Sequence, residues 1–483
     1  MKKILLFVAA SATLLFAACT SESGGPSSNI SYDALKAAEK ADVQTPITFG
    51  TFTPREAVTR LGVIGDEVQL ANHYGFGVFA YYTEGTDYSV TAKPNFMFNQ
   101  QVEAETTGVV PNATAVNGWK YSPIKYWPNN TQKDAENTAY NISDTKDKLS
   151  FFAYAPYIFP ADIAADGTVM DNTVAPAVAK TKGVTKVAPA DGTIAGDVKL
   201  TYVGGSSKYS DELMFGVTQN DRIWNSVDGG SMTIDAGMPF KNLVKPVDND
   251  RTITFYFMHA LTKIGMTVQA AKNQVPVGGT PELWNADAAD PNKTKILIEK
   301  IAFNRDMHYK GTLNLNNTVA GHPLWENTSF ENPFEIKETG LGHADLEDDL
   351  TWEAAYATDP TEAWTKTGVV AGVEKSVFGQ HGTPLRNDYL LLLPEAAAPA
   401  GDTYITITYH VMTKDANLPN GVSDVKNVIK KKIPAALALE KGKSYEFNLI
   451  LGVNTVEMDV DVKDWTVVAE DDIYLPKNKP AAP

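Results

Sequence analysis

Short runs of β-branched and aromatic residues, separated by clusters of Gly, Pro, Asn and Asp, recur along the chain from Pro46 onward. Sustained helical periodicity is rare, and no alternation of strands with helices indicates a parallel sheet. The pattern therefore predicts an all-β chain of β-sandwich architecture. Strands are expected at 46–52, 76–82, 149–157, 252–258, 263–269, 295–303, 311–315, 389–393, 404–412, 444–451 and 455–468.

The length of the chain, 483 residues, is enough for two domains that each bury a core. A charged turn at 246–250 separates two strand-rich halves, and it predicts the domain boundary. The expected domains are residues 46–247 and 248–476, followed by a tail at 477–483. The polar stretches 168–197 and 280–293 are expected to be long loops or small subdomains at one edge.

The N-terminus resembles an export signal. Lys2 and Lys3 precede a nearly unbroken apolar run at 4–16, and small residues then lead to Cys19. This pattern predicts a lipoprotein signal peptide at 1–18, lipidation of Cys19, and a flexible tether at 19–45. An ordinary secretory peptide with an incidental cysteine is the alternative. Because Cys19 is the only cysteine, the chain cannot form an intrachain disulfide.

The formal net charge of −16 at pH 7 argues against nucleic acid and anionic membrane surfaces as partners. No motif of a helical zinc protease, a serine hydrolase, a phosphate loop or a dinucleotide site occurs. The sequence therefore predicts no catalytic residue, no cofactor and no enzyme.

Metal ligands are also not expected. His259 and His410 lie at strand ends within apolar runs, where a core histidine bonded to backbone is favoured over a ligand. The acidic clusters 347–349 and 470–472 lack the spacing of a calcium loop. The loop with Asn285, Asp287 and Asp290 comes closer to that spacing, but a solvated loop is favoured there too.

Eight phrases of the sequence, in their order and spacing, form a specific set; they lie at 47–49, 76–82, 95–102, 119–128, 149–157, 257–264, 442–449 and 462–465. Together they resemble the fimbrillin family, the type V pilins and minor-fimbrillin-like lipoproteins of anaerobic gut and oral bacteria. The resemblance covers roughly residues 46 to 476. It implies two tandem transthyretin-like β-sandwich domains and a palmitate-bearing precursor carried to the outer membrane. It also implies assembly into a cell-surface fimbrium that supports adhesion.

The resemblance further implies how subunits join. An arginine-specific protease cuts after the first strand, and a C-terminal strand of the next subunit fills the apolar groove that opens. Arg60 best matches the cleaved arginine, and Arg55 is the alternative. The expected donor residues are Val456, Met458, Val460 and Val462, which alternate with charged residues. The ordinary alternative is a loop arginine and a last strand that stays in its own domain.

The sequence thus predicts a structural fimbrial subunit. Its expected partners are other pilin subunits, in a homo- or heteropolymer, the protease, the outer membrane through the lipid anchor, and a host glycan or protein. Stalk, anchor and tip positions all remain open. The rival prediction is a surface glycan-binding lipoprotein of a nutrient-uptake system, which would stay monomeric on its tether.

Overall fold

The computed structural model describes most of the chain between residues 46 and 464. Strands dominate this part, and its only α-helix is α2 (Glu67–Asn72), so the predicted all-β fold class is confirmed. Short 3-10 turns are η2 (Pro160–Asp162), η5 (Asp348–Leu350), η6 (Ala354–Ala357) and η7 (Glu362–Trp364). The described residues are 46–52, 67–128, 132–133, 140–141, 147–206, 212–226, 230–247, 252–271, 294–338, 344–369, 373–378, 380–381, 386–387, 389–395, 397–434, 437–452 and 455–464.

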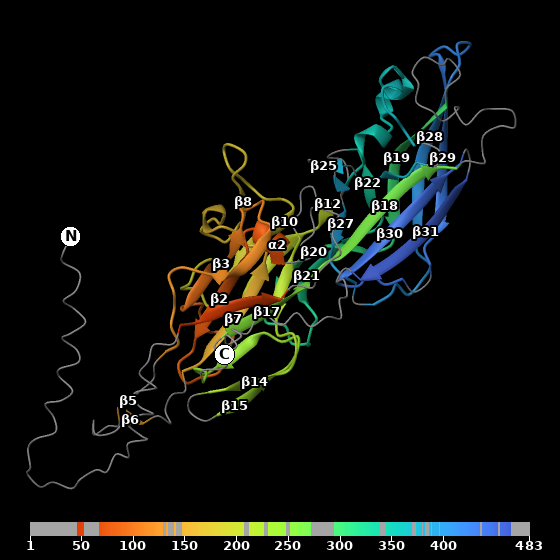
Figure 1. Cartoon of the computed structure of the whole chain (residues 1–483). Helices are drawn as coiled ribbons and strands as arrows, with labels where there is room; N and C mark the ends of the chain where they lie inside the picture. The colour runs from red at the N-terminus through yellow and green to blue at the C-terminus, as the bar shows by residue number, and fades with distance from the viewer. Residues whose placement is uncertain are drawn as a thin grey trace, which may run out of the picture.

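Two stacks of sheets are arranged along the long axis of the molecule (Figure 1). The first sandwich contains an 8-stranded sheet in the order β1-β17-β13-β7-β2-β3-β4, with β16 also paired to β7, and a 4-stranded sheet in the order β10-β11-β20-β21. The bounds in the larger sheet are β1 (Thr48–Phe52), β2 (Phe76–Tyr82), β3 (Met97–Thr107), β4 (Ala115–Lys120), β7 (Leu149–Ala155), β13 (Met214–Val217), β16 (Phe240–Leu243) and β17 (Thr252–His259). Those in the smaller sheet are β10 (Gly183–Ala188), β11 (Lys199–Val203), β20 (Met307–Asn314) and β21 (Leu324–Glu331).

The 8-stranded sheet buries both of its faces, which explains why its central strands are continuous apolar runs. In β7, Phe151 packs in the cluster with Phe255 on one face, whereas Phe152 packs in the cluster with Leu200 and Leu313 on the other. The second of these clusters joins the two sheets of the sandwich. The first is covered in part by Trp224, on the hairpin of β14 (Arg222–Asn225) and β15 (Ser231–Ile234).

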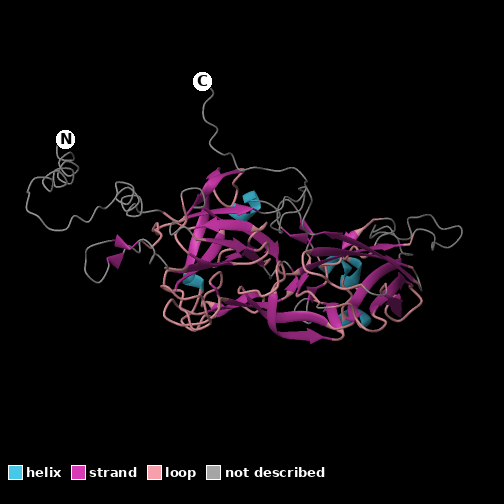
Figure 2. Cartoon of the chain, turned by 90° about the horizontal axis from the view of Figure 1, so that it is seen from below, coloured by secondary structure: helices cyan, strands magenta, loops and turns pink. Residues whose placement is uncertain are grey.

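The second sandwich packs a 6-stranded sheet, β12-β27-β18-β30-β31 with β24 on β18, against a 5-stranded sheet, β23-β22-β19-β28-β29. One large core, which includes Ile264, Ile298 and Phe447, fills the space between them. Figure 2 shows both groups of strands from below. The bounds are β12 (Gly205–Ser206), β18 (Thr262–Ala270), β19 (Thr294–Asn304), β22 (Phe334–Lys337), β23 (Ala344–Asp345), β24 (Lys375–Ser376), β27 (Leu390–Leu392), β28 (Tyr404–Lys414), β29 (Val422–Lys432), β30 (Lys443–Leu451) and β31 (Val456–Asp464).

Three short hairpins complete the described strands. They are β5 (Gln132–Lys133) with β6 (Tyr140–Asn141), β8 (Met170–Asp171) with β9 (Val178–Ala179), and β25 (Gln380–His381) with β26 (Arg386–Asn387). Within the described part of the chain, no helix has the length and apolar character needed to cross a membrane.

Strand pairing crosses the predicted boundary between residues 247 and 248. β17 lies after that point but belongs to the sheet of β1, and β20 pairs with β11. β27 serves both cores, because Leu390 and Leu392 face one cluster and Leu391 faces the other. The division into domains 46–247 and 248–476 and the transthyretin-like arrangement therefore stay predictions.

One segment differs from its expectation. The stretch 168–197, expected to be loops or a small subdomain, contains β10, which pairs with β11. Val184 and Val187 of β10 are buried on the same core, and the register shifts between Val184 and Lys186. A bulge of this kind moves two apolar residues three positions apart onto one face. The period-2 signal of a strand is thereby lost from the sequence.

Gly216, in β13, tests how tightly the first sheet is packed. A Cβ at this position would lie 2.9 Å from the Cβ of Ala153 and 2.9 Å from Cδ1 of Phe255. We expect Gly216→Ala to lower the free energy of unfolding by about 1–3 kcal/mol, measured by urea denaturation, because the site is overpacked.

Gly118→Ala is the matched control, because a Cβ at Gly118 in β4 meets only Glu105 Oε2, at 3.7 Å. Its effect should stay within about 0.5 kcal/mol. Equal stability of the two variants would contradict the close approach of β13 to β7 and β17.

Candidate assembly interface

The first strand, β1, lies at an edge of the 8-stranded sheet. It pairs in parallel with β17, in a register that sets Thr48 beside Thr252 and Phe52 beside Tyr256. The Oγ1 atoms of Thr48 and Thr252 lie 3.1 Å apart. A ladder of backbone hydrogen bonds therefore holds β1 on one side. It occupies a groove only if other residues contact its opposite side.

A second backbone neighbour lies across from β17. The N–H of Ile47 donates to the carbonyl of Lys125 at 2.9 Å, and Pro46 forms an antiparallel bridge with Tyr126. The hydroxyl of Tyr121 donates to the carbonyl of Ile47 at 2.9 Å. Burial raises the pKa of Tyr121, so this phenol keeps its proton at neutral pH. The start of β1 thus lies in a groove between β17 and the segment 121–126.

Ile47, just before β1, and the side chains of β1 that point into the molecule are almost fully buried. Ile47 is 1% exposed, Phe49 6% and Thr51 2%. The ring centroid of Phe49 lies 5.2 Å from that of Tyr121, 6.0 Å from that of Phe151 and 6.1 Å from that of Phe255. Burial of Ile47 and Phe49 contributes about 1.5–3 kcal/mol each. Removal of β1 would leave an apolar slot on the sheet.

The last described strand, β31, also lies at an edge, in the 6-stranded sheet. It pairs antiparallel with β30 along its whole length, from Val456 beside Leu451 to Asp464 beside Lys443. Lys443 and Asp464 form an ion pair that closes this end of the ladder.

The burial of the four expected donor residues decreases along β31 from its first residue to its last. Val456 is 1% exposed, Met458 and Val460 pack partly buried against the core, and Val462 is 44% exposed. The alternate residues Glu457, Asp459, Asp461 and Lys463 are exposed. In the single chain, β31 is thus a member of its own sheet, and its role as a donor stays a prediction. Cys19, Arg55, Arg60 and residues 465–483 lie outside the described residues.

Both histidines expected in the core are buried, at 3% exposure for His259 and 4% for His410. The expected backbone partner is wrong for His410, whose Nδ1 lies 2.7 Å from Asp424 and Nε2 3.1 Å from Glu299. Its ring also stacks on Trp352, at 3.7 Å between centroids. Nδ1 of His259 likewise faces a carboxylate, that of Glu212. Strand backbone groups are already paired in the ladders, so a buried imidazole takes partners from side chains.

The acidic cluster at 347–349 is tied to lysines. Asp348 lies 2.6 Å from the ammonium of Lys366, and Asp349 lies 3.8 Å from that of Lys375. Among the described residues, no three His, Cys, Asp or Glu side chains come together in a way that could hold a metal ion. The loop with Asn285, Asp287 and Asp290 and the cluster 470–472 lie outside the described part.

The sequence did not indicate a large cavity that the fold creates. It has a volume of about 870 Å³ and is lined by residues of β17, β20, β21, the loop after β27 and the turn before β30. Its lining extends from Tyr256 to Asp464, which lie 208 residues apart in the chain, so no local motif could have predicted the cavity.

Fold and edge strands together define an all-β protein with an edge strand near each end of its described chain. Its sequence is 23% identical over 424 residues to the fimbrium subunit Fim1C of Phocaeicola vulgatus, covering 84% of this chain and 86% of that protein. The resemblance to the fimbrillin family expected from the sequence is thereby confirmed. No family model matches the chain.

Solved structures give weaker likenesses. A fimbrial protein from Bacteroides vulgatus is 14% identical, with a TM-score of 0.45, over 88% of this chain and 100% of that one. A fimbrial assembly protein from Parabacteroides distasonis is 9% identical, with a TM-score of 0.27, over 87% of this chain and 99% of that one.

Phe49 is the main apolar anchor of β1, and its removal should loosen that strand selectively. Phe49→Ala should cost about 3–5 kcal/mol of local stability, because a buried ring is lost from a packed site. We expect faster hydrogen exchange at the backbone amides of β1 and of Thr252 to Tyr256, with β30 and β31 unchanged.

Thr48→Ala is the control, because its side chain is exposed and its contact with Thr252 lies at the surface. It should leave exchange in β17 nearly as in the parent. Unchanged exchange in Phe49→Ala would mean that the ring does not hold β1 in place.

Proposed function

We propose that this chain is a structural subunit of a cell-surface fimbrium, exported as a lipoprotein anchored through Cys19 and assembled by protease-triggered strand exchange. The sequence match to a fimbrium subunit supports the structural role, which supports adhesion and needs no catalytic residue. The observation that carries the proposed mechanism is the position of β1, seated between β17 and the segment 121–126.

The first step of the proposed mechanism is cleavage after Arg60, or after Arg55. Both arginines follow β1 in the sequence, so a cut at either separates this strand from the rest of the subunit. The departing strand takes Ile47 and Phe49 with it and uncovers the edge of β17. An open edge beside an apolar slot is a strong site for another strand.

The second step is occupation of that slot by a strand of the next subunit. The buried side chains of Ile47 and of β1 lie at alternate positions 47, 49 and 51, and the apolar side chains of β31 also alternate. A strand with one apolar and one charged face can bury the first in the slot and keep the second in water. The four aliphatic side chains would contribute about 1.5–3 kcal/mol each when fully buried.

Donation of β31 has a cost that the structure makes visible. The strand would have to leave β30, lose a ladder of nine residues and expose Val456, which is now 1% exposed. Exchange is favourable only if binding of the strand in the slot on β17 stabilises it by more free energy than its separation from β30 costs. Met458, Val460 and Val462 can make the exchange favourable, because Met458 and Val460 are only partly buried in their own sheet and Val462 is 44% exposed.

Cleavage can be tested with the purified precursor and an arginine-specific protease. We expect Arg60→Ala to abolish polymers, observed by electron microscopy and size-exclusion chromatography, because β1 stays in its groove. Arg55→Ala is the matched control and should assemble normally. Loss of polymers in Arg55→Ala alone would show that the protease cuts after Arg55. Normal fibres from the double variant would contradict cleavage-triggered assembly.

The donor can be tested at Val462, which is 44% exposed in the single chain. Val462→Asp should leave the fold of the precursor intact but reduce polymer yield at least about tenfold, because a charge is then desolvated in the slot. Glu457→Gln, on the exposed face of the same strand, is the control and should assemble normally.

A truncation after Asp464 separates β31 from the rest of the C-terminus. Polymers from this truncated chain, together with their loss in Val462→Asp, would support β31 as the donor. Normal polymers from Val462→Asp and none from the truncated chain would place the donor beyond Asp464.

A further inference from the structure

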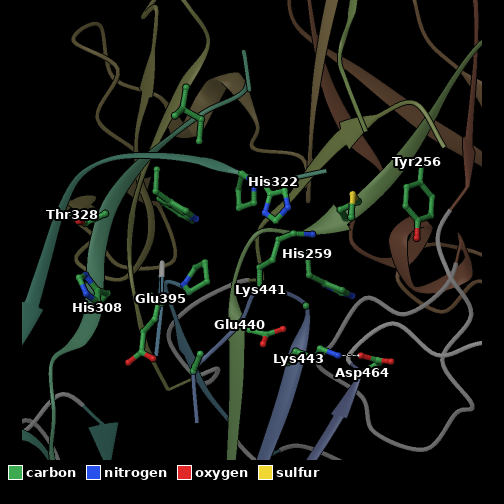
Figure 3. A pocket seen from close by; sticks show the side chains of 18 residues that line it. Tyr256, His259, His308, His322, Thr328, Glu395, Glu440, Lys441, Lys443 and Asp464 are labelled. Atoms are coloured by element: carbon green, nitrogen blue, oxygen red, sulfur yellow. Dashed lines mark hydrogen bonds and ion pairs between the residues drawn. The ribbon is translucent and has the colours of Figure 1, made fainter. Parts of the chain in front are cut away.

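The cavity of about 870 Å³ lies where the first sandwich meets the second, and Figure 3 shows its lining side chains. β17 and β21 form its wall in the first sandwich, and the turn at 438–443 and Asp464 form its wall in the second. Its volume is within the range of small-molecule sites, which often lie between packed units. The question is which ligand its side chains suit.

Most charged groups of the cavity are already neutralised within the protein. Lys443 is paired with Asp464, as Figure 3 shows. Glu395 lies 2.5 Å from the guanidinium of Arg305, and these side chains are 6% and 1% exposed. The charges left for a ligand are the ammonium of Lys441 and the carboxylate of Glu440.

Lys441 is a half-buried cation that lines the same cavity as the imidazole of His322. Its side chain extends toward His322 in Figure 3, and no hydrogen-bond acceptor for its ammonium occurs among the described residues. Burial lowers the pKa of this lysine, which reflects the cost of holding the charge without a partner. An anion placed between Lys441 and His322 would remove that cost.

The turn that carries Lys441 is rigid. The N–H of Gly442 donates to the carbonyl of Leu261 at 2.8 Å, and Gly442 has a φ of +63°, which favours glycine. The hydroxyl of Tyr445 accepts from the N–H of Glu440 at 2.8 Å and donates to the carbonyl of Ala438 at 2.6 Å. The ammonium is therefore presented from a fixed backbone, as a preformed binding group requires.

The remaining wall suits a ring that has both apolar and hydroxyl-bearing faces. The indole of Trp325 lines the cavity and is fixed by its Nε1–H, which donates to the carbonyl of Ala260 at 3.2 Å. Met258 and Pro323 extend this apolar wall. The carboxylate of Glu440 lies apart from Lys441 in Figure 3 and can accept from hydroxyls.

We propose that this cavity binds an acidic saccharide of the hexuronic acid class. Its carboxylate lies between Lys441 and His322, its apolar ring face lies against Trp325, and its hydroxyls donate to Glu440. A bare anion would fill little of the volume and leave the indole wall unused, whereas a neutral sugar would leave the ammonium unpaired. This inference does not rest on the proposed assembly mechanism.

The test is isothermal titration calorimetry on the uncleaved chain with glucuronate, glucose and acetate as separate probes. We expect glucuronate to bind at least about tenfold more tightly than either of the others, because only it engages both walls. Lys441→Gln should weaken glucuronate binding about tenfold or more, since a charge-assisted hydrogen bond is lost. His322→Ala, at an exposed side chain, should weaken it less.

Lys93→Gln is the matched control, because Lys93 is an exposed lysine that does not line the cavity. It should leave the affinity unchanged, and circular dichroism should show all variants folded. Equal affinity for acetate or for glucose, no binding of glucuronate up to about 10 mM, or unaltered binding in both cavity variants would each overturn the proposal. Because the test uses the uncleaved chain, these outcomes are independent of the proposed cleavage step.

Discussion

β17 has a partner on each edge and a core on each face. β13 pairs antiparallel on one edge, and β1 pairs in parallel on the other. Phe255 and Phe257 belong to the cluster on one face, whereas Tyr256 and Met258 pack against the cluster on the other. Two residues after its end the chain enters β18, the central strand of the second sandwich. The groove of β1, the junction of the sandwiches and the wall of the cavity therefore all depend on this one strand, and a change in its position would alter all three.

The sequence predicted strands correctly where the apolar residues follow the two-residue period of a strand and are buried in the fold. Strands expected at 76–82, 252–258, 404–412 and 444–451 are present, because each has a buried face or two. β29 was not expected, and its composition explains why. It is an edge strand with Val425 and Val428 exposed and with Lys426, Lys430 and Lys432 along its length, so it lacks the apolar alternation on which the prediction depends. Lysines at an edge hinder pairing with other chains and so protect the protein from aggregation. They also remove the apolar alternation by which a strand is predicted from sequence.

The pairing between strands that lie far apart in the chain could not be predicted from the sequence pattern. Nothing local indicates that β11 should pair with β20, about a hundred residues later, since any apolar strand could take that place. The same limit applies to the sites. The alternation that marks Val456 to Val462 predicted a strand with one apolar face, but not that this strand lies on β30 with only its first residue fully buried. The cavity was not predicted at all, because Trp325 and Lys441 meet only once both sandwiches have formed.

The two edge strands differ in how firmly they are held, and the difference suits the roles proposed for them. β1 has five residues in a parallel ladder, which is slightly less stable per residue, and it depends on Ile47 and Phe49 for its apolar contacts. While the chain is intact, the covalent link keeps β1 at a high effective concentration near its groove, on the order of millimolar or more for short flexible linkers. A cut after the strand removes that advantage. To keep the cleaved strand bound, two buried side chains and one short ladder must then also offset its loss of translational freedom, which costs roughly 4–15 kcal/mol. The proposed cut would thus open the groove by breaking one peptide bond that follows β1 in the sequence. β31, in contrast, is paired with β30 over nine residues and would leave it only for a site that binds it more strongly.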